Sequence, residues 1–174
     1  MNRVETTAQL RRLCLRAVAQ VESAAGAAVS LMSASGPSGI VATSDDGALK
    51  IAELQFSLGE GPCWDVFDLN HPVVVEDLSS GSGDRWVAWT AAARSHGVRA
   101  ALAFPLQVGP TQVGVLDIYR STPGVLAGEV IAGALALAET ATQILLDGQE
   151  RVGEGSTPTG VDAALEAGLE IYQA

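Results

Sequence analysis

Apolar residues recur at helical spacing in the first part of the chain. Over residues 4–23 they are three or four positions apart, the period of an amphipathic helix: Leu10, Leu13, Cys14, Ala17, Val18 and Val21. Thr6 and Gln9 have the spacing of a capping box, so the helix is expected to begin there. Gly26 follows the periodic stretch and predicts its end.

Short β-prone runs come next. Residues 27–33 and 39–45 are predicted strands, and the Gly-Pro-Ser-Gly sequence at 36–39 predicts the turn between them. The run PVVVEDL, residues 72–78, predicts a third strand, and its unbroken apolar part indicates burial on both faces. Helices are expected at 48–56, at 63–69 after Pro62, and at 86–97 after a polar loop.

The clearest hairpin spans residues 98–121, with Val108 expected opposite Thr111. That register predicts two faces. The first carries Ala100, Leu102, Phe104, Leu106, Val113, Val115, Asp117 and Tyr119. The second carries Arg99, Ala101, Ala103, Pro105, Gly114, Leu116, Ile118 and Arg120. The small residues of the second face predict that helices pack there, and Asp117 is predicted to be a buried carboxylate on the first.

A long helix is expected over residues 127–147, with one apolar stripe of Val130, Ala134, Leu137, Ala141 and Ile144 and a second of Ile131, Leu135, Ala138 and Leu145. We therefore expect three parts: a domain over 1–147, a linker over 148–160, and the start of a C-terminal helix over 161–174. Two stripes exceed what one sheet face needs, which predicts a homodimer. Its expected interface residues are Leu10, Leu13, Ala17, Leu137 and Ile144.

Composition narrows the function. The chain has 174 residues, 48% of them hydrophobic, which is enough for a core, and a formal net charge of −10. With Lys50 as the single lysine, this chain alone is not expected to bind nucleic acid. No signal peptide or membrane-spanning run is recognised, so a cytoplasmic protein without membrane contact is expected. Cys14 and Cys63 are too few for a structural zinc site, and no disulfide between them is expected.

The order of predicted elements resembles the GAF fold, an α+β, GAF/PAS-like antiparallel sheet with a terminal helix bundle on one face and short helices and loops on the other. The resemblance covers roughly residues 10–147. LGEGPCWDVFDLNHPVVVEDLSS, then Asp84-Arg85-Trp86, then GVRAALAFPLQVGPTQVGVLDIYRSTPG look like the GAF half of bacterial GAF–ANTAR response regulators. The final EIYQA resembles the start of the RNA-binding ANTAR module, whose remaining residues are absent here.

Candidate site residues follow partly from that resemblance, which implies a pocket on one sheet face. Its expected residues are Trp64, Trp86, Trp89, Phe104 and Asp117. The alternatives are that the tryptophans only fill the core and that Asp117 pairs with an arginine such as Arg85.

Cys63 follows Pro62 at a helix start, where the helix dipole favours a thiolate, so it is the redox candidate; a small apolar filler is the alternative. His71 and His96 are interpreted as loop residues without a ligand role. No catalytic residues, metal or cofactor are expected, and the protein is not expected to be an enzyme. Three functions stay open: a sensory domain that transmits through its terminal helices, a ligand-free dimerisation scaffold, and a thiol-based redox protein.

Overall fold

The computed structural model describes residues 2–153, without the side chains of residues 82–84 and 150–153. Five antiparallel strands form one sheet in the order β2-β1-β5-β4-β3. They are β1 (Ala24–Ser33), β2 (Gly36–Thr43), β3 (Val73–Val75), β4 (Ala100–Val108) and β5 (Thr111–Arg120). The expected α+β fold is confirmed. The C-terminal helix expected over 161–174 lies outside the described residues.

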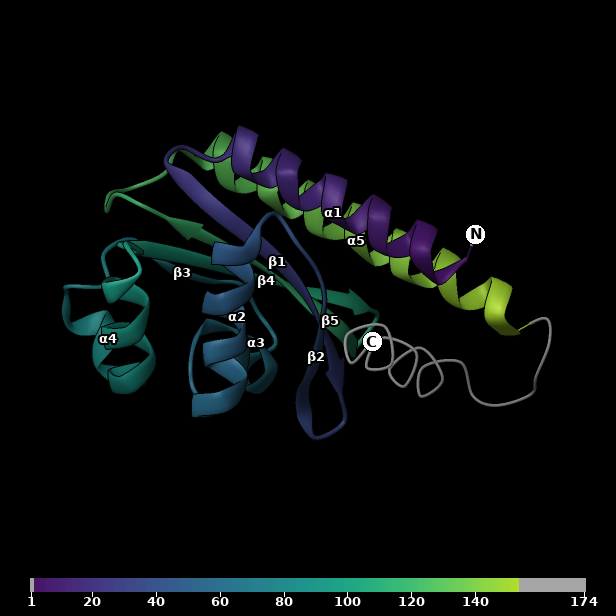
Figure 1. Cartoon of the computed structure of the whole chain (residues 1–174), viewed down its shortest axis with the longest axis horizontal. Helices are drawn as coiled ribbons and strands as arrows, with labels where there is room; N and C mark the ends of the chain where they lie inside the picture. The colour runs from purple at the N-terminus through teal and green to yellow at the C-terminus, as the bar shows by residue number, and fades with distance from the viewer. Residues whose placement is uncertain (1, 154–174) are drawn as a thin grey trace.

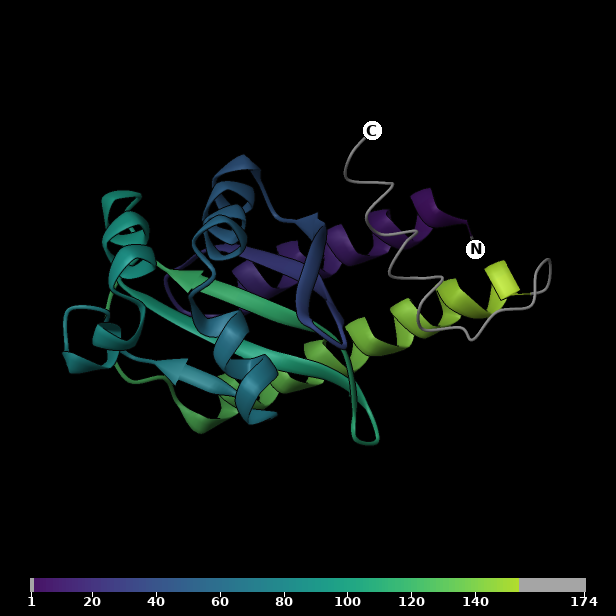
Figure 2. The ribbon, with the colours of Figure 1, turned by 90° about the horizontal axis from the view of Figure 1, so that it is seen from below.

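Helices cover both faces of the sheet. The terminal helices α1 (Arg3–Gln20) and α5 (Gly128–Gly153) lie side by side on one face (Figure 1). The other face is covered by α2 (Asp46–Leu58), α3 (Pro62–Leu69), the short 3-10 helix η1 (Gly81–Trp86) and α4 (Val87–Ser95), as the second view shows (Figure 2). We call these the terminal-helix face and the short-helix face.

Helix α1 has the expected buried stripe but begins earlier than expected. Leu10 and Ala17 are fully buried, as the helical spacing predicts. The predicted capping box at Thr6 is wrong, because Asn2 caps the helix instead. The Asn2 side chain accepts a hydrogen bond from the Glu5 backbone N–H at 2.9 Å.

The β1–β2 turn is tighter than expected, since Gly36 to Gly39 belong to β2. Gly36 has a φ of +125°, and an added Cβ would lie 2.8 Å from the Trp64 ring, so this glycine admits the indole rather than making the turn. The prediction that the third strand is buried on both faces is also wrong. Strand β3 is a short edge strand, and Val74 points outward with 38% of its surface exposed.

A β-bulge changes the faces of the β4–β5 hairpin. Val108 pairs with Thr111 as expected, but the register shifts between Leu106 and Gln107. One extra residue in a strand turns every later side chain to the opposite face. Asp117 therefore pairs with Ala103, and the predicted faces of β4 are exchanged: Ala101 and Ala103 lie on the short-helix face, while Leu102, Phe104 and Leu106 meet the terminal helices.

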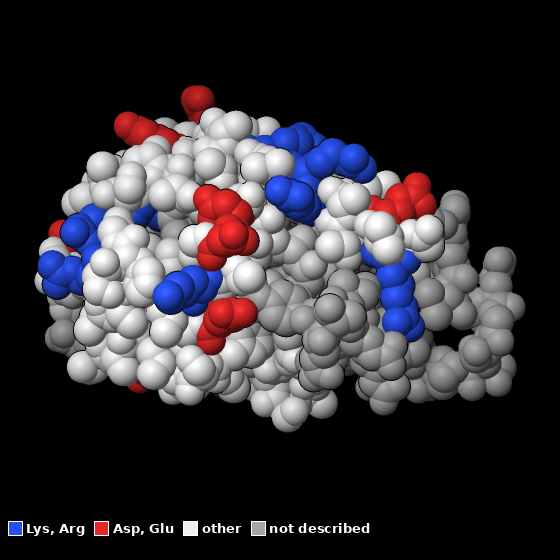
Figure 3. Space-filling view, in the orientation of Figure 1, with Lys and Arg blue, Asp and Glu red and all other residues white. Residues whose placement is uncertain are grey.

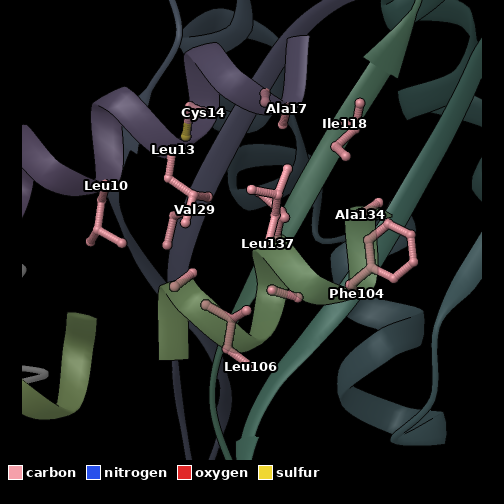
Figure 4. Close-up of a cluster of buried hydrophobic side chains, with 14 of the residues drawn as sticks. Leu10, Leu13, Cys14, Ala17, Val29, Phe104, Leu106, Ile118, Ala134 and Leu137 are labelled. Atoms are coloured by element: carbon pink, nitrogen blue, oxygen red, sulfur yellow. The ribbon is translucent and has the colours of Figure 1, made fainter. Parts of the chain in front are cut away.

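The terminal-helix core is completed within one chain. Side chains from α1, α5 and the sheet interdigitate there (Figure 4). Leu10, Leu13, Ala17 and Leu137 are each at most 3% exposed, and Ile144 packs against the same core. The expectation that Leu10, Leu13, Ala17 and Leu137 form a dimer interface is therefore wrong, because α1 and α5 cover each other as well as the sheet. Ile144 is only partly buried, and its place in an interface stays a prediction.

Helix α5 runs past Asp147 to Gly153, through the first residues of the expected linker. Its segment Gly128–Gln149 is long and apolar enough to cross a membrane by length and composition. In this fold one apolar stripe of the helix packs against the sheet, where Ala134, Leu137 and Ala141 are buried.

Candidate functional site on the short-helix face

The LGEGP sequence forms the junction between α2 and α3. Gly59 ends α2 in the left-handed conformation with a φ of +67°. The Glu60 carboxylate accepts a 2.7 Å hydrogen bond from the Trp89 backbone N–H at the start of α4. Pro62 occupies the first turn of α3. This sequence thus holds three helices together over the sheet.

Gln55 connects that junction to the sheet. It lies on the buried stripe of α2 and is fully buried. Its Oε1 accepts from the Cys63 backbone N–H at 2.9 Å, and its Nε2 donates to Asp117 Oδ2 at 2.9 Å and to the Tyr119 hydroxyl at 3.1 Å. Gly61, with a φ of +132°, leaves room for this side chain, because an added Cβ would lie 2.5 Å from Gln55 Oε1.

Asp117 is the buried acid of this site. Its Oδ2 accepts from Gln55 and, at 3.4 Å, from the Tyr119 hydroxyl, while its Oδ1 has no partner in the described part of the chain. Burial raises the pKa of this carboxyl to about 7, and the hydrogen bond from Gln55 opposes that shift. The alternative pairing with Arg85 is wrong, because Arg85 Nη1 lies 2.9 Å from Asp65 Oδ2.

Tyr119 and two tryptophans form a row of contacts that runs from Asp117 to α4 and η1. The Trp89 ring lies 6.4 Å from Tyr119, and the Trp86 ring packs edge-on against Trp89 at 5.9 Å. Trp86, Trp89 and Asp117 thus share the buried short-helix face, as expected, although aromatic side chains lie between Trp86 and the acid.

The two other expected pocket residues lie elsewhere. Trp64 is half-buried, and its Nε1 donates to the Gln55 carbonyl at 2.9 Å. Phe104 belongs to the terminal-helix core, so its placement in the pocket is wrong; the bulge is the reason.

Neither cysteine has the environment of a reactive thiol. Burial raises the pKa of Cys63 well above its ordinary value, and the negative charge of Asp117 adds to that shift. The thiolate expected from the helix dipole is therefore contradicted. Burial likewise raises the pKa of Cys14 to about 12. The two free thiols belong to the cores on opposite faces of the sheet, so they cannot form a relay.

Arg120 joins the end of β5 to the connecting segments beside the terminal helices. Its side chain is 3% exposed; Nε donates to the Glu22 carbonyl at 3.0 Å and Nη1 to the Gly124 carbonyl at 2.7 Å. Glu22 follows α1, and Gly124 precedes α5. Strand β5 therefore carries the Asp117 cluster on one face and, three residues later, a tether to the terminal helices on the other.

The sequence contained signals for the residues that were missed. Gln55 continues the helical period of Ala48, Ile51 and Ala52, which places it on the buried side of α2. Tyr119 lies two positions after Asp117 in a strand and therefore shares its face. Arg120 gave no comparable signal, because the Glu22 carbonyl that it reaches is distant in sequence.

The outer surface offers other features. Lysine and arginine side chains gather over α1 (Figure 3), where Arg11, Arg12 and Arg16 are exposed. His71 and His96 are exposed and bond to nearby backbone carbonyls. One surface hollow lies between α1 and α2 beside Arg11, and another lies between α5 and the β4–β5 hairpin beside Glu139. Neither hollow is lined by the expected pocket residues.

A sheet with paired terminal helices on one face and short helices on the other defines an α+β fold of the GAF/PAS type. A GAF domain profile matches residues 5–146, and the chain belongs to the GAF family. No curated protein matches the chain.

Several solved structures share the fold at low identity. A free methionine-R-sulfoxide reductase from Thermoplasma acidophilum is 14% identical, with 83% of this chain and 94% of that chain covered and a TM-score of 0.63. The GAF domain of a sensor histidine kinase from Bacillus halodurans is 12% identical, with 83% and 95% covered and a TM-score of 0.59. GAF3 from Slr1393 of Synechocystis is 16% identical, with 84% and 96% covered and a TM-score of 0.62. The fold thus occurs in sensors and in an enzyme, and the function must be argued from the site.

Proposed function

We propose that the chain is a regulatory GAF domain that binds a small molecule at Asp117 and transmits binding to its terminal helices. The observation that carries this proposal is the unpartnered Oδ1 of a fully buried carboxylate within the described residues. Leaving a charged group without a partner in a protein interior is costly, so the arrangement favours a partner that arrives from outside. A sensory role is also the one named for the histidine kinase with the same fold.

Transmission would follow β5. Gln55 and Tyr119 hold Asp117 from the short-helix side, and Arg120 holds the connections to α1 and α5 on the other side. A ligand that moves Asp117 would move a strand whose end is bonded to the segments that connect it to α1 and α5. A thiol-based mechanism is less favoured, because Cys63 is buried and its pKa is raised.

The test is native mass spectrometry of the protein after incubation with a small-molecule extract of the cell. We expect a bound molecule that denaturation releases and that Asp117→Asn loses, while Asp68→Asn, an exposed acid on α3, retains it. Hydrogen exchange should then change near Glu22 and Gly124. If no molecule is retained, or if Asp117→Asn retains it equally, the ligand-free scaffold is favoured.

A homodimer is part of the proposal, with an interface different from the one the sequence suggested. Leu15 on α1 is 48% exposed and Leu135 on α5 is 39% exposed. The exposed arginines of α1 would face the acidic side chains of α5, such as the exposed Glu139, if each α1 met the partner's α5. Light scattering should show a dimer that Leu135→Glu dissociates and that Val87→Glu, on α4, leaves intact. A monomer at high micromolar concentration would contradict it.

We further propose a cytoplasmic protein in which α5 leads to an ANTAR-type RNA-binding output, as the LGEGP, Arg85-Trp86 and EIYQA resemblances suggest. The outward continuation of α5 to Gly153 suits such a connection. A longer protein that includes an ANTAR module after Ala174 should bind a structured RNA, and this chain should not. Equal RNA binding by both would contradict the separation of sensor and output.

A further inference from the structure

Two buried polar atoms without a partner in the described part of the chain lie close together on the short-helix face. They are Asp117 Oδ1 and Ser30 Oγ, in residues that are 1% and 0% exposed. In the β1–β5 register Ala28 is opposite Asp117 and Ser30 is opposite Val115, so Ser30 and Asp117 are diagonal neighbours. The backbone positions of such neighbours are roughly 7–8 Å apart, so their side chains lie on the same face of the sheet and can reach the same small ligand.

Small side chains surround the free carboxylate oxygen along the sheet. Asp117 lies between Ala28 on β1 and Ala103 on β4, both fully buried. Alanine is the smallest residue with a side chain, so neither neighbouring strand covers the acid with a bulky group. The larger side chains of the same buried cluster are the rings of Tyr119 and Trp89 and the aliphatic groups of Met32, Ile51, Val66 and Val115.

The charge of the acid has no cation beside it in the residues that the structure describes. Its hydrogen-bond partners are the neutral groups of Gln55 and Tyr119. Arg85, the cation on η1, is held by Asp65. Burial of this uncompensated charge raises the pKa of Asp117 to about 7, and a bound cation would reverse that shift.

The protein already binds one cation with a carboxylate and an aromatic ring. The Arg85 guanidinium lies 4.7 Å above the Trp86 ring while it pairs with Asp65. Asp117 and the rings of Tyr119 and Trp89 provide the same two kinds of group, a carboxylate and an aromatic ring, closer to the sheet. No cation lies beside them in the residues that the structure describes.

We propose that the ligand of this site is a small organic cation, an ammonium or amidinium group bound by Asp117 Oδ1 and Ser30 Oγ. The cation donates hydrogen bonds to both oxygens, and the rings of Tyr119 and Trp89 form an apolar and aromatic wall. Because the buried side chains of Trp86 on η1 and Trp89 on α4 cover this face of the sheet, entry of the ligand requires that α4 and η1 move from the sheet. This inference rests on the ligand-binding function proposed above and names its chemical class.

The test titrates the full chain at pH 8 with methylammonium, ethanolammonium and acetamidinium chlorides, read by tryptophan fluorescence and thermal melting. Acetamide and sodium acetate are the uncharged and anionic probes, and sodium chloride controls for ionic strength. We expect saturable binding of at least one cation. Asp117→Asn should weaken it at least tenfold and Ser30→Ala several-fold, while Asp68→Asn leaves it unchanged.

A second readout is the Asp117 carboxyl carbon in NMR titrations, whose pKa should fall when the cation is bound. The proposal is overturned if no cation binds saturably, if acetamide binds as tightly, or if Asp117→Asn binds equally while still folded by circular dichroism. If a neutral or anionic cellular molecule binds and Asp117→Asn loses it, the cation class is wrong but the sensory function stands. If neither probes nor cellular molecules bind, both proposals fail.

Discussion

Gln55 and Asp117 are joined by a 2.9 Å hydrogen bond across the interface between helix α2 and the sheet. The donor is on a helix that also anchors α3 through Cys63, and the acceptor is on the strand that ends at Arg120. This one contact therefore connects the helices that cover the site to the strand that leaves it.

Asp117→Asn should change how stability depends on pH. The carboxyl titrates at its ordinary pKa of 3.8 in the unfolded chain, and burial raises the pKa to about 7 in the folded protein. Between these values the folded protein binds more protons than the unfolded chain, so this acid makes stability fall as pH rises from about 4 to about 7. The free energy of unfolding of Asp117→Asn, relative to wild type, should rise over that range by roughly 4 kcal/mol at most.

Urea unfolding at pH 5, 6, 7 and 8 measures this difference. Asp77→Asn is the matched control, because hydrogen bonds from Ser79 lower the pKa of Asp77. The stability that the ionised Asp77 contributes is lost only as pH falls through that lowered pKa. The free energy of unfolding of Asp77→Asn, plotted against pH, should therefore run parallel to that of wild type over pH 5–8. Parallel curves for Asp117→Asn would show that the acid is not buried as described.

Gly61→Ala should destabilise the protein more than Gly59→Ala. Gly59 has the left-handed conformation, which costs an alanine about 1–2 kcal/mol, and Gly61, with a φ of +132° and a ψ of 176°, has one that essentially only glycine adopts, which costs about 1–3 kcal/mol. At Gly61 the new Cβ would also lie 2.5 Å from Gln55 Oε1, whereas nothing lies within 4 Å at Gly59. Chemical denaturation should show an additional loss at Gly61 of about 1–3 kcal/mol. Equal losses would contradict both the backbone conformation of Gly61 and the contact of Gln55 with it.

Arg120→Met should release the tether to the terminal helices. It leaves the Glu22 and Gly124 carbonyls without their guanidinium donors, at a cost of about 2–4 kcal/mol. Hydrogen exchange should rise near residues 22–24 and 121–128, while β3 is unaffected. Arg99→Met is the control, since that side chain bonds to the Arg94 and Val98 carbonyls, which are near it in sequence. A similar response to both changes would remove Arg120 from the transmission route.

Cys14 and Cys63 should resist alkylation in the native protein. Both thiols are buried and both have raised pKa values, so little thiolate is available at pH 8. Intact-mass measurements with iodoacetamide should show no addition within minutes in buffer and two additions in urea. Rapid modification of Cys63 in the folded protein would contradict its burial and would favour the thiol-based redox function.

The sequence predicted most elements because their signals are local. The spacing of Leu10, Leu13 and Ala17 located α1, and the alternation around Asp117 showed that this acid is buried. The bulge at Val113, opposite Leu106 and Gln107, was not predictable, since both faces of β4 are apolar and either register buries them. That ambiguity alone put Phe104 in the wrong core.

The site was predicted in part for a similar reason. Trp86, Trp89 and Asp117 were expected on one face and lie there, but hydrogen-bond partners such as Gln55 come from an element 62 positions away. Four of the five expected dimer residues were misassigned because counting apolar stripes cannot show that α1 and α5 cover each other.

The bulge also limits how the gene can change, because its extra residue, Val113, lies in β5 and not in the tip of the hairpin. The tip, Gln107 to Thr111, is exposed and resembles a loop that tolerates changes. Loss of Val115 would shift the rest of β5 by one position and turn Asp117 and Tyr119 toward the terminal helices. The carboxylate would then face the apolar core beneath α1 and α5, while Leu116 and Ile118 would leave that core. We therefore expect substitutions at the tip to be tolerated and a deletion of Val115 to prevent folding.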